Sequence, residues 1–165
     1  MPAQLDEVDL QLLEELQRDA DRTNVELARV VGLSPAATLN RVRRLKDSGV
    51  VRTVTAAVEP EAAGFTLHVY VSVTLGRHDE RAHRRFQDAV AALPQVIRAD
   101  WVSGEVDALL EVVARGIEEL QRVLLLLSSR GGALRVMTML RMEELKPPSP
   151  LPVRAERVGR GHGDT

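Results

Sequence analysis

Residues 23–46 read TNVELARVVGLSPAATLNRVRRLK, a stretch that predicts two short helices joined by a tight turn. Thr23 and Glu26 fit a capping box at the start of the first helix, because each side chain can bond the backbone N–H of the other residue. Gly32 supplies a left-handed residue just past the end of that helix. Ser34 then caps the second helix, with a proline at its first position, where the missing N–H costs nothing.

The second of these helices carries the candidate DNA contacts. Leu39, Val42 and Leu45 form its apolar side, and its other faces present small residues first and arginines later. This order predicts a helix-turn-helix, and the alternative is a helical hairpin with a solvated basic face. The predicted DNA-binding residues here are Ser34, Ala36, Ala37, Thr38, Asn40, Arg41, Arg43 and Arg44.

The predicted roles of these residues follow from their chemistry. Arg41 and Arg44 lie three positions apart, hence on one helix face, and arginine can grip phosphate or fork onto guanine. The helix N-terminus at Ser34, with the N–H groups of the two following alanines, favours phosphate. Asn40 can pair bidentately with adenine, and Thr38 can also reach a base edge.

Two flanking segments complete the expected N-terminal domain. A helix over 5–20, capped by Asp6, presents an apolar stripe against which the two helices of the helix-turn-helix can pack. Residues 50–58 are rich in β-branched side chains and predict one or two strands, a small wing. Arg52 and Thr53 on this wing are predicted to touch the DNA backbone.

From residue 66 the pattern changes to that of a second domain. The expected order is strand, helix, strand, strand, helix, strand, which predicts a ferredoxin-like βαββαβ sheet and an α+β chain. The expected last strand, 134–144, is apolar on both faces, so we expect its second face to be buried in a homodimer. The predicted parts are residues 1–60 for DNA binding, 61–66 as linker, 67–146 for sensing and oligomerisation, and 147–165 as a tail that is disordered beyond about Val153.

Composition narrows the function classes. The chain has no cysteine, which excludes a thiol nucleophile or a cysteine metal site, and its 2% aromatic content leaves few stacking platforms for single-stranded nucleic acid. The net charge of -2 is unevenly spread: residues 6–26 hold eight acids and two arginines, whereas residues 31–56 carry an excess of four positive charges. No signal peptide or membrane-spanning run is recognisable, so the expected location is cytoplasmic, with no membrane partner.

Several short motifs occur together along the chain. They are Leu5-Asp6-x-x-Asp9, 24–28, 31–35, 41–45, 48–51, Ser103-Gly104-Glu105-x-Asp107 and 142–146. With these motifs the sequence from Leu5 to Lys146 resembles the Lrp/AsnC family of feast/famine transcriptional regulators. The Gly-Leu-Ser-Pro turn followed by Arg-Val-Arg-Arg-Leu is specific in combination.

The resemblance implies a regulator that binds double-stranded DNA and forms dimers that assemble further, often to octamers. It also implies no cofactor but a small-molecule effector, an amino acid held between dimers near a Gly-Asp-x-Asp turn. That turn has Glu in place of its first Asp here, and residues 129–132 replace the family's Leu-Pro-Gly-Val. The predicted effector-binding residues are Ser103, Gly104, Glu105, Asp107 and Thr138.

Other interpretations stay open at this point. The turn at 104–107 can be a plain β-turn that joins two strands, which would leave a ligand-independent regulator. Some tetrapyrrole-pathway decarboxylases also resemble this family in both domains, but they do not need a recognition helix with well-formed caps, and His68 is the only strand histidine available. A third alternative is an interaction module that modifies other regulators. We therefore expect a sequence-specific DNA-binding regulator and no enzyme.

Overall fold

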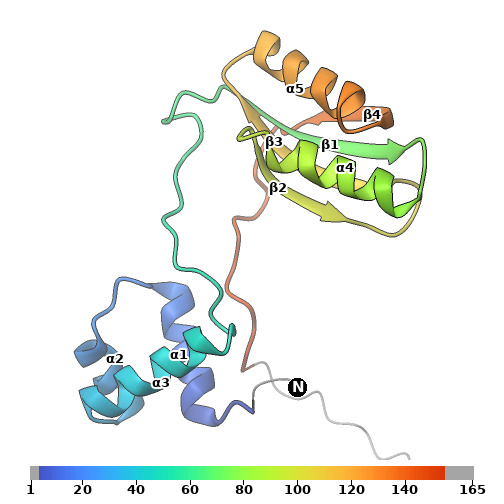
Figure 1. Cartoon of the computed structure of the whole chain (residues 1–165). Coiled ribbons are helices and arrows are strands. Elements are labelled where there is room, and N and C mark those ends of the chain that lie inside the picture. The colour runs from blue at the N-terminus through green and yellow to red at the C-terminus, as the bar shows by residue number, and fades with distance from the viewer. Residues whose placement is uncertain (1–3, 155–165) are drawn as a thin grey trace, which may run out of the picture. The chain divides into compact units, whose positions relative to one another are not determined.

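A computed structural model describes residues 4–154, in two compact units (Figure 1). The N-terminal unit comprises residues 4–56 and, from the far end of the chain, residues 146–154. The C-terminal unit comprises residues 57–145. None of the helices in this part of the chain is both long and apolar enough to cross a membrane.

The N-terminal unit is a three-helix domain with the predicted caps, and its first helix is two residues shorter at each end than the predicted range 5–20. Its helices are α1 (Glu7–Arg18), α2 (Asn24–Val31) and α3 (Pro35–Asp47). Asp6 and Thr23 each form a reciprocal capping box, Gly32 has a φ of 68°, and Ser34 caps α3. Their apolar faces meet in a core that includes Leu12, Leu13, Leu27, Val42 and Leu45. The predicted helix-turn-helix is thus confirmed.

The predicted wing is wrong, because residues 50–58 form no strand. Val50 and Val51 pack against the helical core, but residues 52–58 are exposed. The described part of the N-terminal unit contains no strand with which this segment could pair, and an unsupported short hairpin is at best marginally stable in water. Its β-branched composition is therefore not enough to make a sheet.

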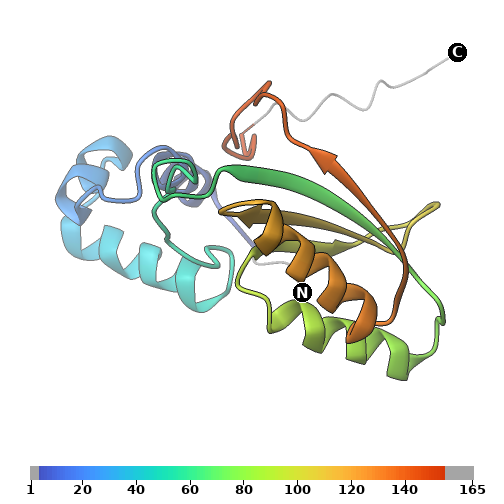
Figure 2. The same cartoon turned by 90° about the horizontal axis from the view of Figure 1, so that it is seen from above.

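The C-terminal unit is the predicted α+β sandwich of one sheet and two helices. Its elements are β1 (Leu67–Leu75), α4 (Glu80–Ala91), β2 (Val96–Trp101), β3 (Ala108–Ala114), α5 (Ile117–Ser129) and β4 (Ala133–Leu140). The strand order is β2-β3-β1-β4, and every neighbouring pair is antiparallel. Both helices cover one face of the sheet (Figures 1 and 2). This is the ferredoxin-like arrangement.

The two faces of the sheet differ in their environment. Val69, Val71 and Val73 of β1 lie under the helices with almost no exposed area, and full burial of such side chains contributes about 1.5–3 kcal/mol each. On the opposite, open face, the backbone register pairs Tyr70 with Met139. Large apolar side chains remain exposed on this face, namely Tyr70, Leu109, Met137 and Met139.

The chain beyond β4 differs from the prediction. Residues 147–154 were expected to belong to a separate tail, but they group with the N-terminal unit. Val153 packs against the core of the three helices, so this segment does have apolar area to bury. The remainder of the predicted tail, residues 155–165, lies outside the described residues.

Candidate nucleic-acid interface and effector site

A buried carboxylate on α1 fixes the position of α3. The Asp9 side chain is only 1% exposed, and Arg41 Nη1 donates to Asp9 Oδ1 over 2.9 Å, while Arg44 Nη2 donates to Asp9 Oδ2. The backbone N–H of Asp6 also donates to Asp9 Oδ2 at 3.2 Å. Because a buried charge is tolerated only when it is paired and hydrogen-bonded, these donors make Asp9 a fixed anchor for the two arginines.

Asp6 extends this anchor at the N-terminus of α1. Arg41 Nη1 also donates to Asp6 Oδ2, at 2.7 Å. The pKa of the Asp6 carboxyl lies below its ordinary value, because the backbone N–H of Asp9 and then the Arg41 guanidinium bond to the carboxylate. The same bonds, first to Asp6 and then to Asp9, raise the pKa of Arg41. Arg41 therefore stays charged and held against α1.

The structure revises the predicted roles of the α3 side chains. Thr38 is fully buried and its hydroxyl donates to the Ser34 carbonyl oxygen, so the prediction that it reads a base edge is wrong. The reason is packing, because this position of α3 faces the other helices. The side chain of Arg41 is 28% exposed and bonded to α1, whereas that of Arg44 remains 57% exposed despite its bond to Asp9.

The exposed face of α3 is a continuous strip. Ala36, Asn40, Arg43 and Arg44 are exposed and follow the i, i+4, i+7, i+8 spacing of one helix face. Among the residues that the structure describes, no ion pair engages Arg43. At the N-terminus of the helix, the exposed Ser34 accepts a bond from the Ala37 N–H, which occupies one of the two amides predicted for phosphate. We call Ala36, Asn40, Arg43 and Arg44 the α3 strip.

The predicted wing contacts have no regular scaffold. Arg52 and Thr53 are exposed, in a segment without strand structure. Their predicted contact with the DNA backbone remains a prediction, and it would have to come from an irregular segment.

The turn between β2 and β3 has a firm structural function. Gly104 has a φ of 125°, Val102 N–H donates to the Asp107 carbonyl oxygen, and Asp107 N–H donates to the Val73 carbonyl oxygen. The Asp107 carboxylate accepts from the Leu75 N–H at 2.7 Å, which ties the turn to the end of β1. The exposed Ser103 and Glu105 remain available to a ligand, whereas the Asp107 carboxylate already bonds the backbone of β1.

Thr138 does not join this turn within one chain. It lies on β4 opposite Val71, and β1 separates β4 from β3 in the sheet. The predicted effector site groups Thr138 with Ser103, Gly104, Glu105 and Asp107. It does so because the order of the strands in the sheet is not evident from their order in the chain. Within one sheet, β1 therefore lies between Thr138 and the strand that follows the turn.

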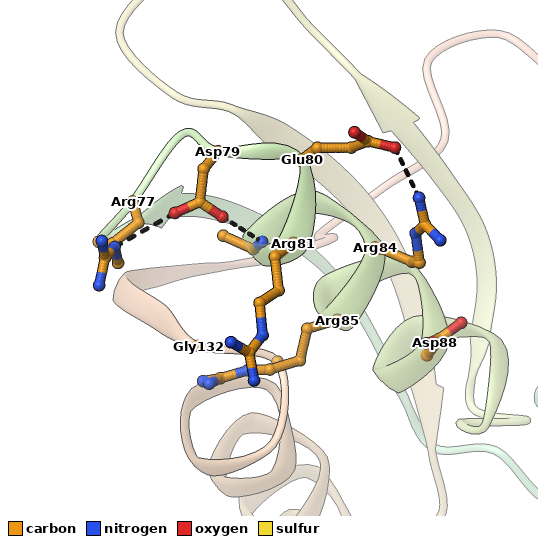
Figure 3. Close-up of a pocket in the computed structure, with 11 residues that line it drawn as sticks. Arg77, Asp79, Glu80, Arg81, Arg84, Arg85, Asp88 and Gly132 are labelled. Atoms are coloured by element: carbon orange, nitrogen blue, oxygen red, sulfur yellow. Dashed lines mark hydrogen bonds and ion pairs between the residues drawn. The ribbon is translucent and has the colours of Figure 1, made fainter.

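Two polar groupings of the C-terminal unit are not predicted by the sequence. His68 bonds Glu111 at 2.7 Å and Arg141 at 2.9 Å on the open face of the sheet. A hollow of about 940 Å³ beside the start of α4 is lined by four arginines and, on the α5–β4 turn, by Gly131 and Gly132 (Figure 3). The four arginines are Arg77, Arg81, Arg84 and Arg85. Their close spacing in the sequence was the available signal for the hollow.

The buried anchor predicts a large effect of one substitution. Asp9→Asn removes the charge that Arg41 and Arg44 compensate, and breaking a buried ion pair in this way costs about 3 kcal/mol or more. We expect a clear drop in the urea midpoint of the N-terminal unit. Asp47→Asn, at the exposed end of α3, is the matched control and should change the midpoint little. Equal midpoints for the two variants would contradict the anchoring role of Asp9.

Comparisons with known proteins agree with this geometry. The family model described as Lrp/AsnC ligand binding domain matches residues 68–151, and the model described as winged helix-turn-helix DNA-binding matches residues 5–52. The leucine-responsive regulatory protein of Rhizobium meliloti is 37% identical over 144 residues, which is 87% of this chain and 92% of that protein.

Solved structures show the same two-part architecture. A transcriptional regulator from Neisseria meningitidis, solved as a complex with L-methionine, superimposes with a TM-score of 0.84 at 30% identity, over 91% of this chain and 97% of that one. An AsnC family regulator from Agrobacterium tumefaciens superimposes with a TM-score of 0.82 at 28% identity, over 91% and 98% of the two chains. The chain therefore belongs to the Lrp/AsnC family of metabolite-responsive, DNA-binding transcriptional regulators.

Proposed function

We propose that this regulator binds a specific double-stranded DNA sequence through the α3 strip and that an amino acid modulates this binding. The observation that supports the DNA contact most directly is the pairing of Arg41 and Arg44 with Asp9, which fixes the orientation of α3. With α3 held in this way, Asn40 and Arg43 are presented outward for a groove, while Ser34 offers a helix N-terminus to phosphate. We propose no catalytic activity.

The amino-acid effector is proposed to bind at the β2–β3 turn, with its site completed between copies of the chain. Ser103 and Glu105 are exposed beside Gly104, so an ammonium group could meet the Glu105 carboxylate. Thr138 lies on β4, which β1 separates from β3, and we propose that it contributes from a neighbouring copy. The L-methionine complex of the Neisseria meningitidis relative supports the choice of an amino acid as ligand class.

A homodimer through the open face of the sheet is proposed as the basic assembly. Tyr70, Leu109, Met137 and Met139 are between 37% and 48% exposed there, and an apolar patch of this kind is typical of an interface. We further propose that dimers assemble, up to an octamer, in a way that places β4 of one copy near the turn of another. The effector could then shift the equilibrium between assembly states only if it binds one state more tightly.

The DNA contact can be tested with one arginine. Arg43→Ala removes an outward charge that has no structural partner among the described residues, so we expect the fold to persist. The affinity for the DNA upstream of the chain's own gene should fall by roughly 10-fold. The measurement is a fluorescence-anisotropy titration at two salt concentrations, with random DNA as competitor. A phosphate contact would also reduce the salt slope by about 1.

Arg122→Ala is the matched control, because this arginine is exposed on α5 in the other unit. It should leave the affinity and the salt slope unchanged. If Arg43→Ala behaved like Arg122→Ala, the α3 strip would not be the interface.

The effector site can be tested at Glu105, which is exposed beside the turn. Glu105→Gln keeps the size of the side chain and removes its charge, so it should abolish the response of DNA binding to a pool of common amino acids. Each variant is compared with its own DNA affinity in the absence of amino acids. Glu118→Gln, at the exposed first turn of α5, is the control. If DNA binding by Glu105→Gln still responded to amino acids, the turn would have a purely structural role.

The assembly can be tested on the open face. Met137→Asp places a charge among the exposed apolar side chains, and a desolvated unpaired carboxylate strongly opposes association. We expect the molar mass from light scattering to fall to that of a monomer. Leu125→Asp, also exposed but on α5 behind the sheet, should retain the mass of the unmodified chain. The same mass for both variants would exclude this face as the dimer contact.

A further inference from the structure

The segment that follows the C-terminal unit returns to α1. Leu151 N–H donates to Gln17 Oε1 at 2.7 Å, and Gln17 Nε2 donates back to the Leu151 carbonyl oxygen at 3.3 Å. One side-chain amide thus satisfies both backbone groups of Leu151, as a neighbouring strand would. Two residues later, Val153 packs against the apolar core of the three helices. The contact is therefore both polar and apolar.

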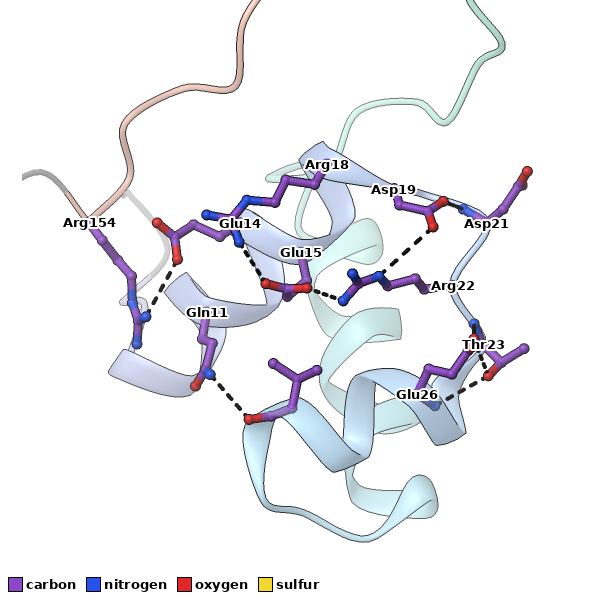
Figure 4. A network of polar contacts seen from close by, with 11 residues as sticks. Gln11, Glu14, Glu15, Arg18, Asp19, Asp21, Arg22, Thr23, Glu26 and Arg154 are labelled. Carbon is purple, nitrogen blue, oxygen red and sulfur yellow. Dashed lines mark hydrogen bonds and ion pairs between the residues drawn. The ribbon is translucent and has the colours of Figure 1, made fainter.

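Arg154 provides the electrostatic part of this contact. Arg154 pairs with Glu7 in the first turn of α1. Its Nη1 also lies 3.4 Å from Glu14 Oε2, and Figure 4 shows this second pairing. The side chains of Arg154 and Glu14 are 31% and 27% exposed, and Arg154 Nε is buried. The Arg154 guanidinium is thus partly buried on the Glu14 side, whereas its partner Glu7 is 74% exposed.

Glu7, Glu14 and Gln17 are spaced seven and three positions apart, so they share one face of α1. We call these three residues the α1 acidic face. DNA binding offers no reason for eight acids within residues 6–26, since phosphate repels carboxylates. Contact with an arginine from the far end of the chain explains part of this acidic stretch.

The proline content of the returning segment lowers the conformational entropy lost on docking. Four of the residues between 146 and 153 are prolines, at positions 147, 148, 150 and 152. Each proline restricts φ in the free chain, so less conformational entropy is lost when the segment becomes ordered. The segment turns at its end, where the Val153 N–H donates to the Leu151 carbonyl oxygen at 2.8 Å, and this turn brings Val153 against the core.

The first turn of α1 connects this contact to α3. Asp6 and Asp9 bind Arg41 and Arg44 of α3, while Glu7, which lies between them in the sequence, binds Arg154. The returning segment and the helix that carries the α3 strip are thus attached to the same turn. Only residues 141–150 separate the end of β4 from the docked Leu151.

We infer that the α1 acidic face is a recognition surface for the chain's own segment Leu151–Arg154, and that this docking raises DNA affinity by holding the first turn of α1. The segment links the last strand of the effector-binding unit to the anchor of α3. A rearrangement at β4 that pulls the segment away would loosen that anchor. The statement on DNA affinity rests on the proposed function, whereas the docking itself does not.

Because the chain has no cysteine, the docking can be tested by cross-linking in the full-length protein. Gln17→Cys with Leu151→Cys replaces the two Gln17–Leu151 hydrogen bonds by a pair of thiols and leaves Val153 and Arg154 unchanged. Rapid reaction with a short bismaleimide should give a product that migrates as a monomer. Adding Arg154→Glu should slow the cross-link severalfold, while the matched change Arg122→Glu, on α5, should not.

Each outcome of this experiment decides the docking. Equal rates with Arg154→Glu and Arg122→Glu would show that the segment is merely tethered near α1 and would overturn the recognition surface. A product of dimer size would show that the segment docks on another copy and would overturn the assignment to its own chain. A monomeric product whose rate depends on Arg154 supports it.

The effect on DNA is measured separately. Arg154→Ala should weaken binding to the upstream DNA by roughly three- to tenfold, Arg154→Lys should retain part of the affinity, and the control Arg122→Ala on α5 should have no effect. Unchanged affinity in Arg154→Ala would overturn the coupling. If the unmodified chain bound no DNA, the proposed function would fail while the cross-linking result would still stand.

Discussion

The structure of the DNA-binding unit depends on one buried carboxylate. Asp9 is almost completely excluded from solvent and is satisfied by Arg41, Arg44 and a backbone N–H. A buried charge of this kind contributes little net stability when paired, but it penalises every arrangement of α1 and α3 that leaves it unpaired. Its effect is therefore on orientation, because it selects one placement of α3 among the many that the apolar core alone would allow.

This constraint divides the basic residues of α3 between two tasks. Arg41 is held against α1 and stays charged, whereas Arg43 extends outward. Arg44 bonds Asp9 of α1 and is also exposed to solvent. A recognition helix needs both kinds of arginine, since base contacts require side chains that reach outward from a helix whose position is fixed. The abundance of arginine in this helix thus reflects support of the helix as well as the proposed contact with DNA.

The C-terminal unit presents a comparable division between its two faces. The helices bury the β1 valines on one side, while the other side exposes a strip of tyrosine, leucine and methionine. The β2–β3 turn is fixed to β1 through Asp107, which leaves Ser103 and Glu105 outside the internal bonding of the sheet. A sheet with an open apolar face and a fixed turn is suited to the proposed assembly, in which the effector binds between copies.

The sequence by itself determined the helices of the first unit and the order of elements in the second, because capping boxes, glycine turns and strand alternation depend on residues close together in the chain. It could not assign a task to each arginine, since Arg41 and Asp9 are 32 residues apart and Gln17 and Leu151 are 134 apart. Pairings over such separations depend on which faces pack together. The burial of Thr38, the separation of Thr138 from the turn, the absence of the wing and the return of the C-terminal segment to α1 were decided only by the tertiary structure.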